Sequence, residues 1–551
     1  MHLVFQDIGA GFGGHGILGR VADDGARDAA HRRTNRAADN GASHGARGRT
    51  AHGAAARRGG IGRFDMGDLG LGDDDRLARG HDRGGLRGRR AHRQKDGRGR
   101  KQEGVLHGLS PFQTGERTPS ARRRFRTCRF RQAPRRIGRA ATLVPQRGLG
   151  RMHALFVTLP LYSHLRGFQA LARAWTDRGH RASFLVLPGG PPMPGLDALT
   201  LPGPSVAPPP GNVLALARHG ARQTERLCRD GLPMARSLGV DVVLGDQMEP
   251  ASGLIARALG VPLASVACAV PMDPEPGVPL PFLSWPYDPS ARGLKRQRAA
   301  GAVAGLLMAP QDRVVARISR EWGLGDLRSL ADCLSPHLTL AQMIPGFDYP
   351  RPAVGWRIAE LGPFAPPDPA QGFPPDIRPD PGRPLVYVSL GTIMGRRAGV
   401  LARIAAACRE CGAQVLVSHG GCLDGAQAAA IPADWVRDFV PQRAVLARAD
   451  LCVTHAGLNT VLECLGAGVP MLALPLAYDQ PGVAARIRHH GLGSVLGPLQ
   501  RGRRPVAQAV AALLADPGPR ARLRPFAARA ATAPGAAGAV PLVEALVAGS
   551  R

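Results

Sequence analysis

Residues 439–480 constrain the fold of this chain more than any other stretch, and they read FVPQRAVLARADLCVTHAGLNTVLECLGAGVPMLALPLAYDQ. The apolar runs LCVT and MLAL indicate buried strands, and the small residues after the first run predict a turn into a helix that begins near Leu458. The polar side chains at the element ends are Gln442, His455, Asn459, Thr460, Glu463, Asp479 and Gln480. Buried strands with polar tips are typical of an open parallel sheet that binds a ligand at the carboxyl ends of its strands.

The turn THAGLNT predicts an anion site at the start of this helix. The free backbone N–H groups of a first helical turn and the positive end of the helix dipole favour a bound anion, and a diphosphate suits such a site. Gly457 supplies a flexible turn, and His455, Asn459 and Thr460 supply further hydrogen-bond donors.

The other polar tips suit hydroxyl groups and a flat ring. Glu463, one turn into the helix, can accept a pair of hydroxyls such as those of a ribose, and Phe439 offers a flat face for a base. Asp479 and Gln480 suit sugar hydroxyls, the first as an acceptor pair and the second as a mixed donor and acceptor. Each signal is weak alone, but the ordered set FVPQ, H-x-G-x-N-T-x-x-E and DQ is specific.

Strands and helices alternate on both sides of a proline-rich segment. In the first half, HALFVTLP, ASFLVLP, VDVVLGD and PLASVAC indicate strands, and GFQALARAWTDRGH and ASGLIARALG indicate helices. In the second half, the strand PLVYVSLGT runs into Ser389, Gly391 and Thr392. Residues 363–384 read as a semi-rigid linker. We expect the α/β class, with two doubly wound parallel sheets facing a cleft and a domain boundary near residue 375.

Two residues at strand ends of the first half predict a general base with its partner. His164 lies in the expected loop after the first strand, and Asp246 ends the strand VDVVLGD. Because the carboxyl ends of parallel strands share one edge of a sheet, the two side chains can meet there. A carboxylate fixes the tautomer of a neighbouring imidazole and stabilises its protonated form. A solvated surface histidine is the alternative.

A loop rich in proline and aromatic residues, residues 271–290, follows these strands. Exposed Phe282, Trp285 and Tyr287 would mark a pocket for an apolar ligand or a loop that faces a membrane. The next residues, ARGLKRQR, can contact anionic lipid head groups. A packed loop followed by a solvated basic helix start is the alternative.

Residues 1–151 differ in character from the rest. Residues 1–150 hold 32 Lys and Arg against 14 Asp and Glu, so +18 of the total formal charge of +30 falls there. The composition is too poor in aliphatic residues to bury a core, and we expect a disordered extension or translated upstream DNA, with Met152 as the physiological start. Gly9, Gly11 and Gly14 match a dinucleotide fingerprint, but no strand–helix–strand unit follows. The basic run 121–139 is the best nucleic-acid candidate.

The cysteines form no framework. The nine cysteines are scattered, and Cys408 with Cys411 predicts a helix face in preference to a metal or redox site. No apolar run is long enough to span a membrane, and no signal-peptide core is present at the start.

The motifs of residues 439–480 resemble the nucleotide-sugar signature of the UDP-glycosyltransferase family. That resemblance implies a GT-B architecture, with residues 152–375 binding the acceptor and residues 376–551 the nucleotide sugar. It implies that Phe439 stacks on uracil, where the plant enzymes usually carry Trp, and that Val440 meets the base through its backbone. The remaining implied donor contacts are Gln442 and Glu463 to the ribose, His455, Gly457, Asn459 and Thr460 around the diphosphate, and Asp479 and Gln480 to the sugar. Thr392 is a further residue expected in the donor site. His164 and Asp246 match the catalytic base and its partner. Ala456 departs from the usual Gly or Cys.

A narrower resemblance, to bacterial zeaxanthin glucosyltransferases, covers nearly all of residues 152–551 through segments such as LPLYSHLRGFQALA and YDQPGVAARI. It implies UDP-glucose as donor and the ring hydroxyl of zeaxanthin as acceptor, giving a mono- and then a diglucoside. We expect a direct displacement with inversion at the anomeric carbon and without a metal or cofactor, because the helix dipole and the donors stabilise the charge of the leaving group. We expect Phe282 and Trp285 to contact the acceptor, and a cytoplasmic enzyme associated peripherally with the inner membrane.

Three alternatives stay open at this point. The same fold can serve a glycosyltransferase for a polyketide, a sterol or another apolar alcohol. A nucleic-acid-binding protein would use residues 121–139, and a nucleotide-sugar epimerase would turn over UDP-sugar without an acceptor.

Overall fold

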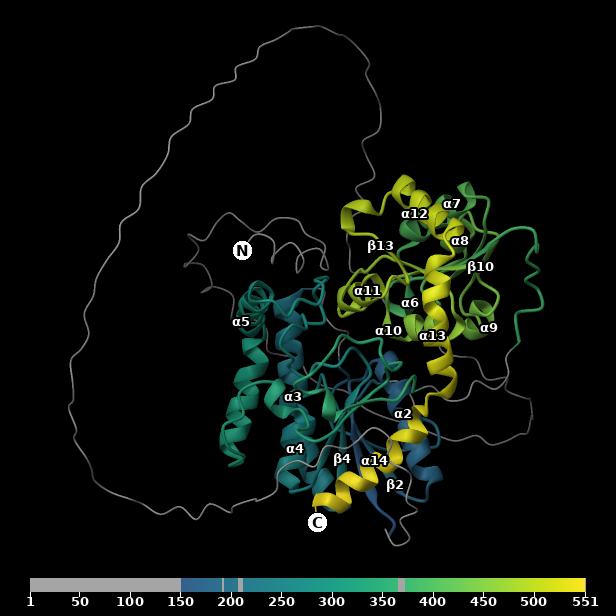
Figure 1. The fold of residues 1–551 in the computed structure, drawn as a ribbon. Coiled ribbons are helices and arrows are strands. Elements are labelled where there is room, and N and C mark those ends of the chain that lie inside the picture. Colours follow the sequence, from purple (N-terminus) through teal and green to yellow (C-terminus); the bar gives the residue numbers. More distant parts are fainter. Residues whose placement is uncertain (1–149, 191–192, 207–211, 365–371, 551) are drawn as a thin grey trace, which may run out of the picture. The chain divides into compact units, whose positions relative to one another are not determined.

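The computed structural model describes residues 150–190, 193–206, 212–364 and 372–550 (Figure 1). The fingerprint match at Gly9, Gly11 and Gly14 and the basic run 121–139 lie outside the described residues. The described strands form two sheets, of seven and six strands.

The first sheet has the strand order β3-β2-β1-β4-β5-β6-β7, and all its pairings are parallel. Its strands are β1 His153–Val157, β2 Arg181–Val186, β3 Asp197–Thr200, β4 Val242–Asp246, β5 Leu263–Ala267, β6 Thr339–Ala341 and β7 Ile358–Glu360. Its helices are α2 Tyr162–Asp177, α3 Val213–Leu238, α4 Ala251–Leu259 and α5 Ala291–Glu321, with short 3-10 turns at Ala331–Cys333 and Gly355–Arg357.

The second sheet has the order β10-β9-β8-β11-β12-β13, again parallel throughout. Its strands are β8 Leu385–Ser389, β9 Gln414–Ser418, β10 Trp435–Arg437, β11 Leu451–Thr454, β12 Met471–Ala473 and β13 Gly493–Val495. The helices around it are α6 Gly391–Met394, α7 Ala398–Glu410, α8 Gly425–Ala429, α9 Gln442–Leu446, α10 Leu458–Ala467, α11 Gln480–His489, α12 Arg503–Ala515 and α13 Gly518–Thr532, with a 3-10 turn at Pro498–Gln500. The last helix is α14, Gly535–Ser550.

The central strands are apolar on both faces because helices cover both sides of each sheet. All five residues of β1 (HALFV) and of β8 (LVYVS) are buried. These observations confirm the expected α/β class with two doubly wound parallel sheets.

Each sheet reverses its strand order at one place, and four of the predicted site residues end or follow the strands on either side of it: His164, Asp246, Thr392 and His455. In the first sheet the chain turns from β1 toward β2 and β3 and later returns to β4 on the other side of β1. In the second sheet β8 and β11 are the corresponding neighbours. The crevice at such a switch point is where open α/β sheets bind ligands.

The last helix, α14, completes the core of the first sheet. Ala539, Val540, Val543 and Val547 are buried in one cluster with Phe156, Phe168 and Trp175. Glu544 also accepts hydrogen bonds from Arg178 and His180. Figure 1 shows this helix in yellow beside α2. The division at residue 375 remains a prediction, and α14 belongs by its packing to the first core.

Candidate active site

His164 and Asp246 form a tightly bonded pair. The Nδ1 atom of His164 lies 2.6 Å from Oδ2 of Asp246, whose side chain is fully buried. Asp246 also accepts hydrogen bonds from the Thr158 hydroxyl (3.2 Å) and from the backbone N–H of Met248 (2.9 Å). Both carboxylate oxygens are therefore fixed, and Nε2 is the ring nitrogen of His164 left for a substrate.

The expectation that His164 lies in a loop is wrong. It occupies the first turn of α2, whose N-cap residue Leu161 makes no side-chain capping bond. The backbone N–H of His164 bonds to the Leu161 carbonyl at 3.0 Å. A side chain on a helical turn is held more rigidly than one on a loop, which suits a base that must meet its substrate in one orientation.

The surroundings of His164 make it a stronger base than a free histidine. Burial alone would lower its pKa, but the charge and hydrogen bond of Asp246, with a further contribution from Asp479, raise the pKa above the ordinary 6.5. Burial also raises the pKa of Asp479, and the charge of His164 opposes that rise. Asp479, at the N-cap of α11, therefore lies within electrostatic reach of the pair.

His455 directly follows the strand β11 and lies in the turn that leads into α10. Gly391 and Gly457 lie against its ring, and a side chain at either position would collide with it. Burial lowers the pKa of His455 to about 4, although an interaction with the Ser389 backbone opposes the change. The ring is therefore neutral at physiological pH. Its buried Nδ1 finds no hydrogen-bond partner among the described residues, as expected of a group that awaits a ligand.

The turn itself is strained. Ala456 and Tyr478 are the two described non-glycine residues with positive φ, at 64° and 58°. The first precedes the start of α10 and the second precedes Asp479, so both stand beside predicted ligand contacts. A left-handed conformation costs a residue with a side chain on the order of 1 kcal/mol, and such strain gathers at functional sites.

A chain of contacts joins the His164 segment to this turn. The amide of Gln342 donates to Oδ1 of Asn459 (3.0 Å) and to the carbonyl of Cys268 (2.6 Å). Cys268 Sγ in turn lies 3.7 Å from the carbonyl oxygen of His164. Asn459 thus has a fixed side chain, and the two switch points are linked through three residues. Gln342 was not predicted, because a glutamine after a short strand carries no local signal.

The two residues predicted to contact the ribose, Gln442 and Glu463, are hydrogen-bonded to each other. The Tyr387 hydroxyl donates to Gln442 Oε1 (2.9 Å), and Gln442 Nε2 donates to Glu463 (2.6 Å) and lies 3.5 Å from the Thr460 hydroxyl. Tyr387 orients Gln442 from within β8, and sequence reasoning missed it. Its signal was a tyrosine hydroxyl inside the apolar run LVYV.

The predicted base contacts stand at the end of β10. Phe439 is 67% exposed, and Gly421 leaves room for its ring. Val440 packs partly against the core behind it. Thr392 is exposed in the short helix α6 after β8.

Gln480 is more restricted than the sequence suggests. Its Oε1 atom accepts from the backbone N–H groups of Leu476 and Ala477 at 2.7 and 2.8 Å. Only its amide N–H groups are left for a sugar, so the expected mixed donor and acceptor is reduced to a donor.

The aromatic loop 271–290 is packed rather than exposed, which corrects the expectation. Phe282 and Trp285 are half-buried, and Tyr287 stacks on Tyr349 with ring centroids 5.6 Å apart. The carbonyl of Pro281 accepts from the Gly482 N–H at 2.9 Å, and a side chain at Gly482 would collide with it. The loop that carries the predicted acceptor residues is thus joined directly to α11.

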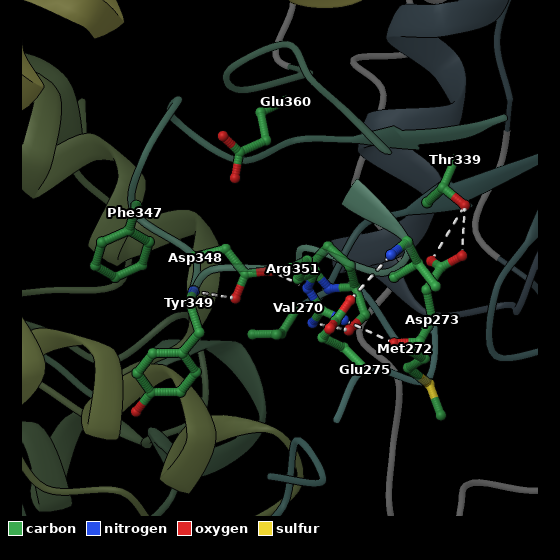
Figure 2. A network of polar contacts seen from close by, with 12 residues as sticks. Val270, Met272, Asp273, Glu275, Thr339, Phe347, Asp348, Tyr349, Arg351 and Glu360 are labelled. Atoms are coloured by element: carbon green, nitrogen blue, oxygen red, sulfur yellow. Dashed lines mark hydrogen bonds and ion pairs between the residues drawn. The ribbon is translucent and has the colours of Figure 1, made fainter. Parts of the chain in front are cut away.

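Figure 2 shows the polar network around Arg351, which joins Asp348 to the start of this loop. Arg351 donates to Asp348 and to the carbonyls of Pro271 and Asp273, all at 2.7 Å. Asp348 also binds Arg486 of α11, which is 1% exposed. Burial alone would raise the pKa of Asp348, but Arg486 and Arg351 outweigh it and hold that pKa below its ordinary value. The pair sets the position of α11 and hence of Asp479 and Gln480.

The described residues contain neither a cluster of metal ligands nor a single helix that could span a membrane. No three His, Cys, Asp or Glu side chains there form a group that could hold a metal ion. Cys408 and Cys411 lie at the end of α7, and the Cys411 thiol contacts the carbonyls of Ala407 and Ala507. No single described helix is long and apolar enough to cross a membrane; α13 and α14 meet that test only as a pair bent by 60°.

Glu249 is a buried carboxyl group next to the pair, and it gives a testable pH dependence. Oε1 accepts from Thr224 (2.7 Å) and from the Ala251 N–H (3.0 Å), whereas Oε2 finds no partner among the described residues. Burial raises its pKa to about 7; the two hydrogen bonds oppose the rise and the charge of Asp246 adds to it.

The folded protein therefore holds a proton on Glu249 that the unfolded chain releases near pH 4.5. Stability is lost as pH rises from about 4.5 to about 7, by about 3 kcal/mol for this group. We expect Glu249→Gln to remove this loss. Thermal unfolding of both proteins at pH 5 and pH 8 tests it, because the difference between them cancels groups common to both. Equal pH dependence of the two proteins would contradict the assignment.

Comparison with known proteins identifies the family. A family model described as UDP-glucoronosyl and UDP-glucosyl transferase matches residues 338–521. The zeaxanthin glucosyltransferase of Pseudescherichia vulneris is 35% identical over 418 residues, which are 72% of this chain and 99% of that relative. The chain belongs to the UDP-glycosyltransferase family. The zeaxanthin glucosyltransferase of Pantoea ananas is 38% identical to this UDP-glycosyltransferase over 363 residues, 62% of this chain and 84% of that one.

Solved structures agree with the architecture. The glycosyltransferase of kitacinnamycin matches with a TM-score of 0.59 at 22% identity, covering 72% of this UDP-glycosyltransferase and 100% of that chain. The calicheamicin glycosyltransferase CalG4 matches with a TM-score of 0.57 at 22% identity, covering 73% and 99%. These likenesses confirm the GT-B fold, and the family confirms the resemblance found in the sequence.

Proposed function

We propose that this UDP-glycosyltransferase moves glucose from UDP-glucose to the ring hydroxyl of zeaxanthin, first at one end and then at the other. The choice of zeaxanthin as the acceptor is supported by the extent of the similarity to zeaxanthin glucosyltransferases. The family model covers residues 338–521, mostly the second half, whereas one such relative is matched over 99% of its length. The similarity thus includes the half that holds His164, Asp246 and the loop 271–290.

The proposed reaction is a direct displacement with inversion at the anomeric carbon. Since Asp246 engages Nδ1 of His164, Nε2 accepts the proton of the acceptor hydroxyl. The hydroxyl oxygen forms the new bond to the anomeric carbon, and the bond from that carbon to the β-phosphate oxygen breaks. UDP leaves with the electron pair, and Asp246 stabilises the imidazolium.

The leaving diphosphate is stabilised at the start of α10. The free backbone N–H groups of the first helical turn face the charge that develops there, and neutral His455 adds one N–H donor. In this reaction the helix start and His455 stabilise the leaving group, and no metal or cofactor takes part.

Incubation of the purified protein with UDP-glucose and zeaxanthin in detergent micelles tests the function. We expect a mono- and then a diglucoside by chromatography and mass spectrometry, with β-glucosidic linkages from the α-configured donor. Transfer to a sterol or a polyketide but not to zeaxanthin would favour the alternative acceptors. Turnover of UDP-glucose without any acceptor would indicate an epimerase instead.

The proposed base contact predicts a loss of UDP affinity on shortening Phe439. Stacking of a base on an aromatic ring contributes about 1–3 kcal/mol, so Phe439→Ala should raise the Kd of UDP roughly 5- to 150-fold. Calorimetric titration measures it. Phe439→Trp serves as the matched control and should retain binding, and the exposed position leaves thermal stability unchanged. An unchanged Kd in the alanine variant would exclude the stacking role.

A further inference from the structure

The first half of α5 exposes an apolar surface that the glycosyl transfer does not use. Residues 299–310 read AAGAVAGLLMAP and contain no polar side chain, yet most of them are exposed or half-buried, and Leu306 is 76% exposed. A surface helix ordinarily turns polar side chains to water. An uninterrupted apolar stretch on the outside therefore indicates a contact with another apolar phase.

Basic side chains border this stretch. Arg292, Lys295, Arg296 and Arg298 lie in the first two turns of α5, and no Asp or Glu occurs between residues 291 and 311. The guanidinium of Arg296 lies 4.5 Å from the ring of Trp285. Lys295, Ala299, Ala302 and Leu306 follow at intervals of four, three and four residues, so they share one exposed face. We name Arg292, Lys295, Arg298, Ala299, Ala302 and Leu306 the α5 surface.

The α5 surface lies toward the edge of the first sheet formed by the carboxyl ends of its strands, where His164 and Asp246 also lie. Figure 1 shows α3 and α5 side by side. Gln311 donates to Thr224 and Arg317 pairs with Glu225, so the two helices run in the same direction. Both begin after the carboxyl ends of strands, the edge at which Asp246 ends β4.

The start of α3 adds to the exposed apolar area. Leu214 is 47% exposed and precedes Thr224 by ten residues. Gly301 precedes Gln311, the hydrogen-bond partner of Thr224, by the same number, so Leu214 and Gly301 lie at about the same height along the two helices. At 1.5 Å per residue, Leu214 and Leu306 lie within roughly 8 Å of each other along the helix axes.

We propose that the α5 surface docks on the anionic head groups of a lipid bilayer, with Leu306 entering the boundary of the acyl chains. The charge complementarity favours this occupant: basic residues meet anionic lipid while the apolar turns beside them lose water. A second copy of the chain would place these cations against each other. This inference rests on the proposed function, because a carotenoid acceptor dissolves in the bilayer and docking would bring the enzyme to that acceptor.

Vesicle sedimentation with the full chain tests the docking. We expect binding to vesicles that contain phosphatidylglycerol, weak binding to phosphatidylcholine alone, and a decrease with salt. Neutralising three cations in Arg292→Gln/Lys295→Gln/Arg298→Gln should lower the partition coefficient on the order of 100-fold. Leu306→Glu should lower it roughly tenfold or more. The matched control is Leu499→Glu, at a fully exposed leucine of the second half, which should bind like the parent.

A local measurement separates the α5 surface from other basic parts of the chain, including residues 1–150. Hydrogen exchange of peptides from residues 291–310 should slow when anionic vesicles are added, whereas peptides of α12 should not change. Parental binding by both α5 variants, or no protection in residues 291–310, would overturn the proposal. So would a dimer in ultracentrifugation that Leu306→Glu dissociates, because the surface would then join two copies.

Transfer assays keep this proposal distinct from the proposed function. In detergent micelles the α5 variants should glucosylate zeaxanthin at the parental rate, and with zeaxanthin in anionic vesicles they should be slower by the factors lost in binding. If the parent binds vesicles through α5 but transfers nothing in micelles, the proposed function fails and the docking stands. If the parent and the α5 variants glucosylate zeaxanthin in vesicles at the same rate, the docking fails and the function stands.

Discussion

Replacing His164 by alanine is expected to lower kcat by a factor of about 10²–10⁴, the range typical of a lost general base. The imidazole is the group whose free Nε2 can take the acceptor proton, because Nδ1 is engaged by Asp246 at 2.6 Å. The predicted donor contacts lie on other elements, after β8, β10, β11 and β12, so the Kd of UDP should not change. Steady-state kinetics and calorimetric titration measure the two quantities.

The control for this substitution is His337→Ala, at an exposed histidine of the same half. It should retain parental kcat. In His164→Ala, Asp246 keeps its hydrogen bonds to Thr158 and to the Met248 N–H, so the fold should survive. Parental turnover in His164→Ala would remove the histidine from the mechanism.

Asp246→Asn should have a comparable effect for a different reason. An asparagine whose Oδ1 keeps the Met248 N–H bond presents its amide N–H₂ to His164. That donor selects the imidazole tautomer with its proton on Nε2, the wrong one for a base. We expect kcat to fall about 10²–10⁴-fold with little change in UDP binding.

The pH profile distinguishes this effect from simple misfolding. In the parent, kcat/KM should rise with pH through a pKa above the ordinary 6.5, since the neutral imidazole is the active form. Without the carboxylate the pKa of His164 falls. The midpoint at which the remaining activity of Asp246→Asn rises with pH should therefore lie at lower pH than in the parent. Thr158→Val removes one hydrogen bond to the same carboxylate and should cost far less. A profile of unchanged midpoint in Asp246→Asn would contradict the coupling.

The donor side could be predicted from the sequence because its signals are local. The strand, turn and helix from Leu451 to Ala467 follow one another, and buried apolar residues, a small turn and free N–H groups suffice to locate an anion site. The pairing of His164 with Asp246 was also accessible, since strand ends of a parallel sheet share an edge. Its geometry was not, because 82 residues separate the two side chains.

Other features leave no local signal. The helix α2 begins without a capping side chain, so its first turn reads as a loop. The long helices α3 and α5 each contain an internal proline, Pro233 and Pro310, which ordinarily ends a helix. The strands β6 and β7 have three residues each. The bond between Asp348 and Arg486 joins segments 138 residues apart, and only the folded chain brings them together.

The return of α14 to the first sheet has a consequence for biosynthesis. Val543 and Val547 fill the core around Phe168 and Trp175, so the half that is synthesised first lacks part of its interior until the final helix has left the ribosome. Domains ordinarily fold as units in the order of their synthesis. Here the second half can fold while the first still exposes the apolar face of α2. The nascent chain therefore depends on its last helix, or on a chaperone, to cover that face.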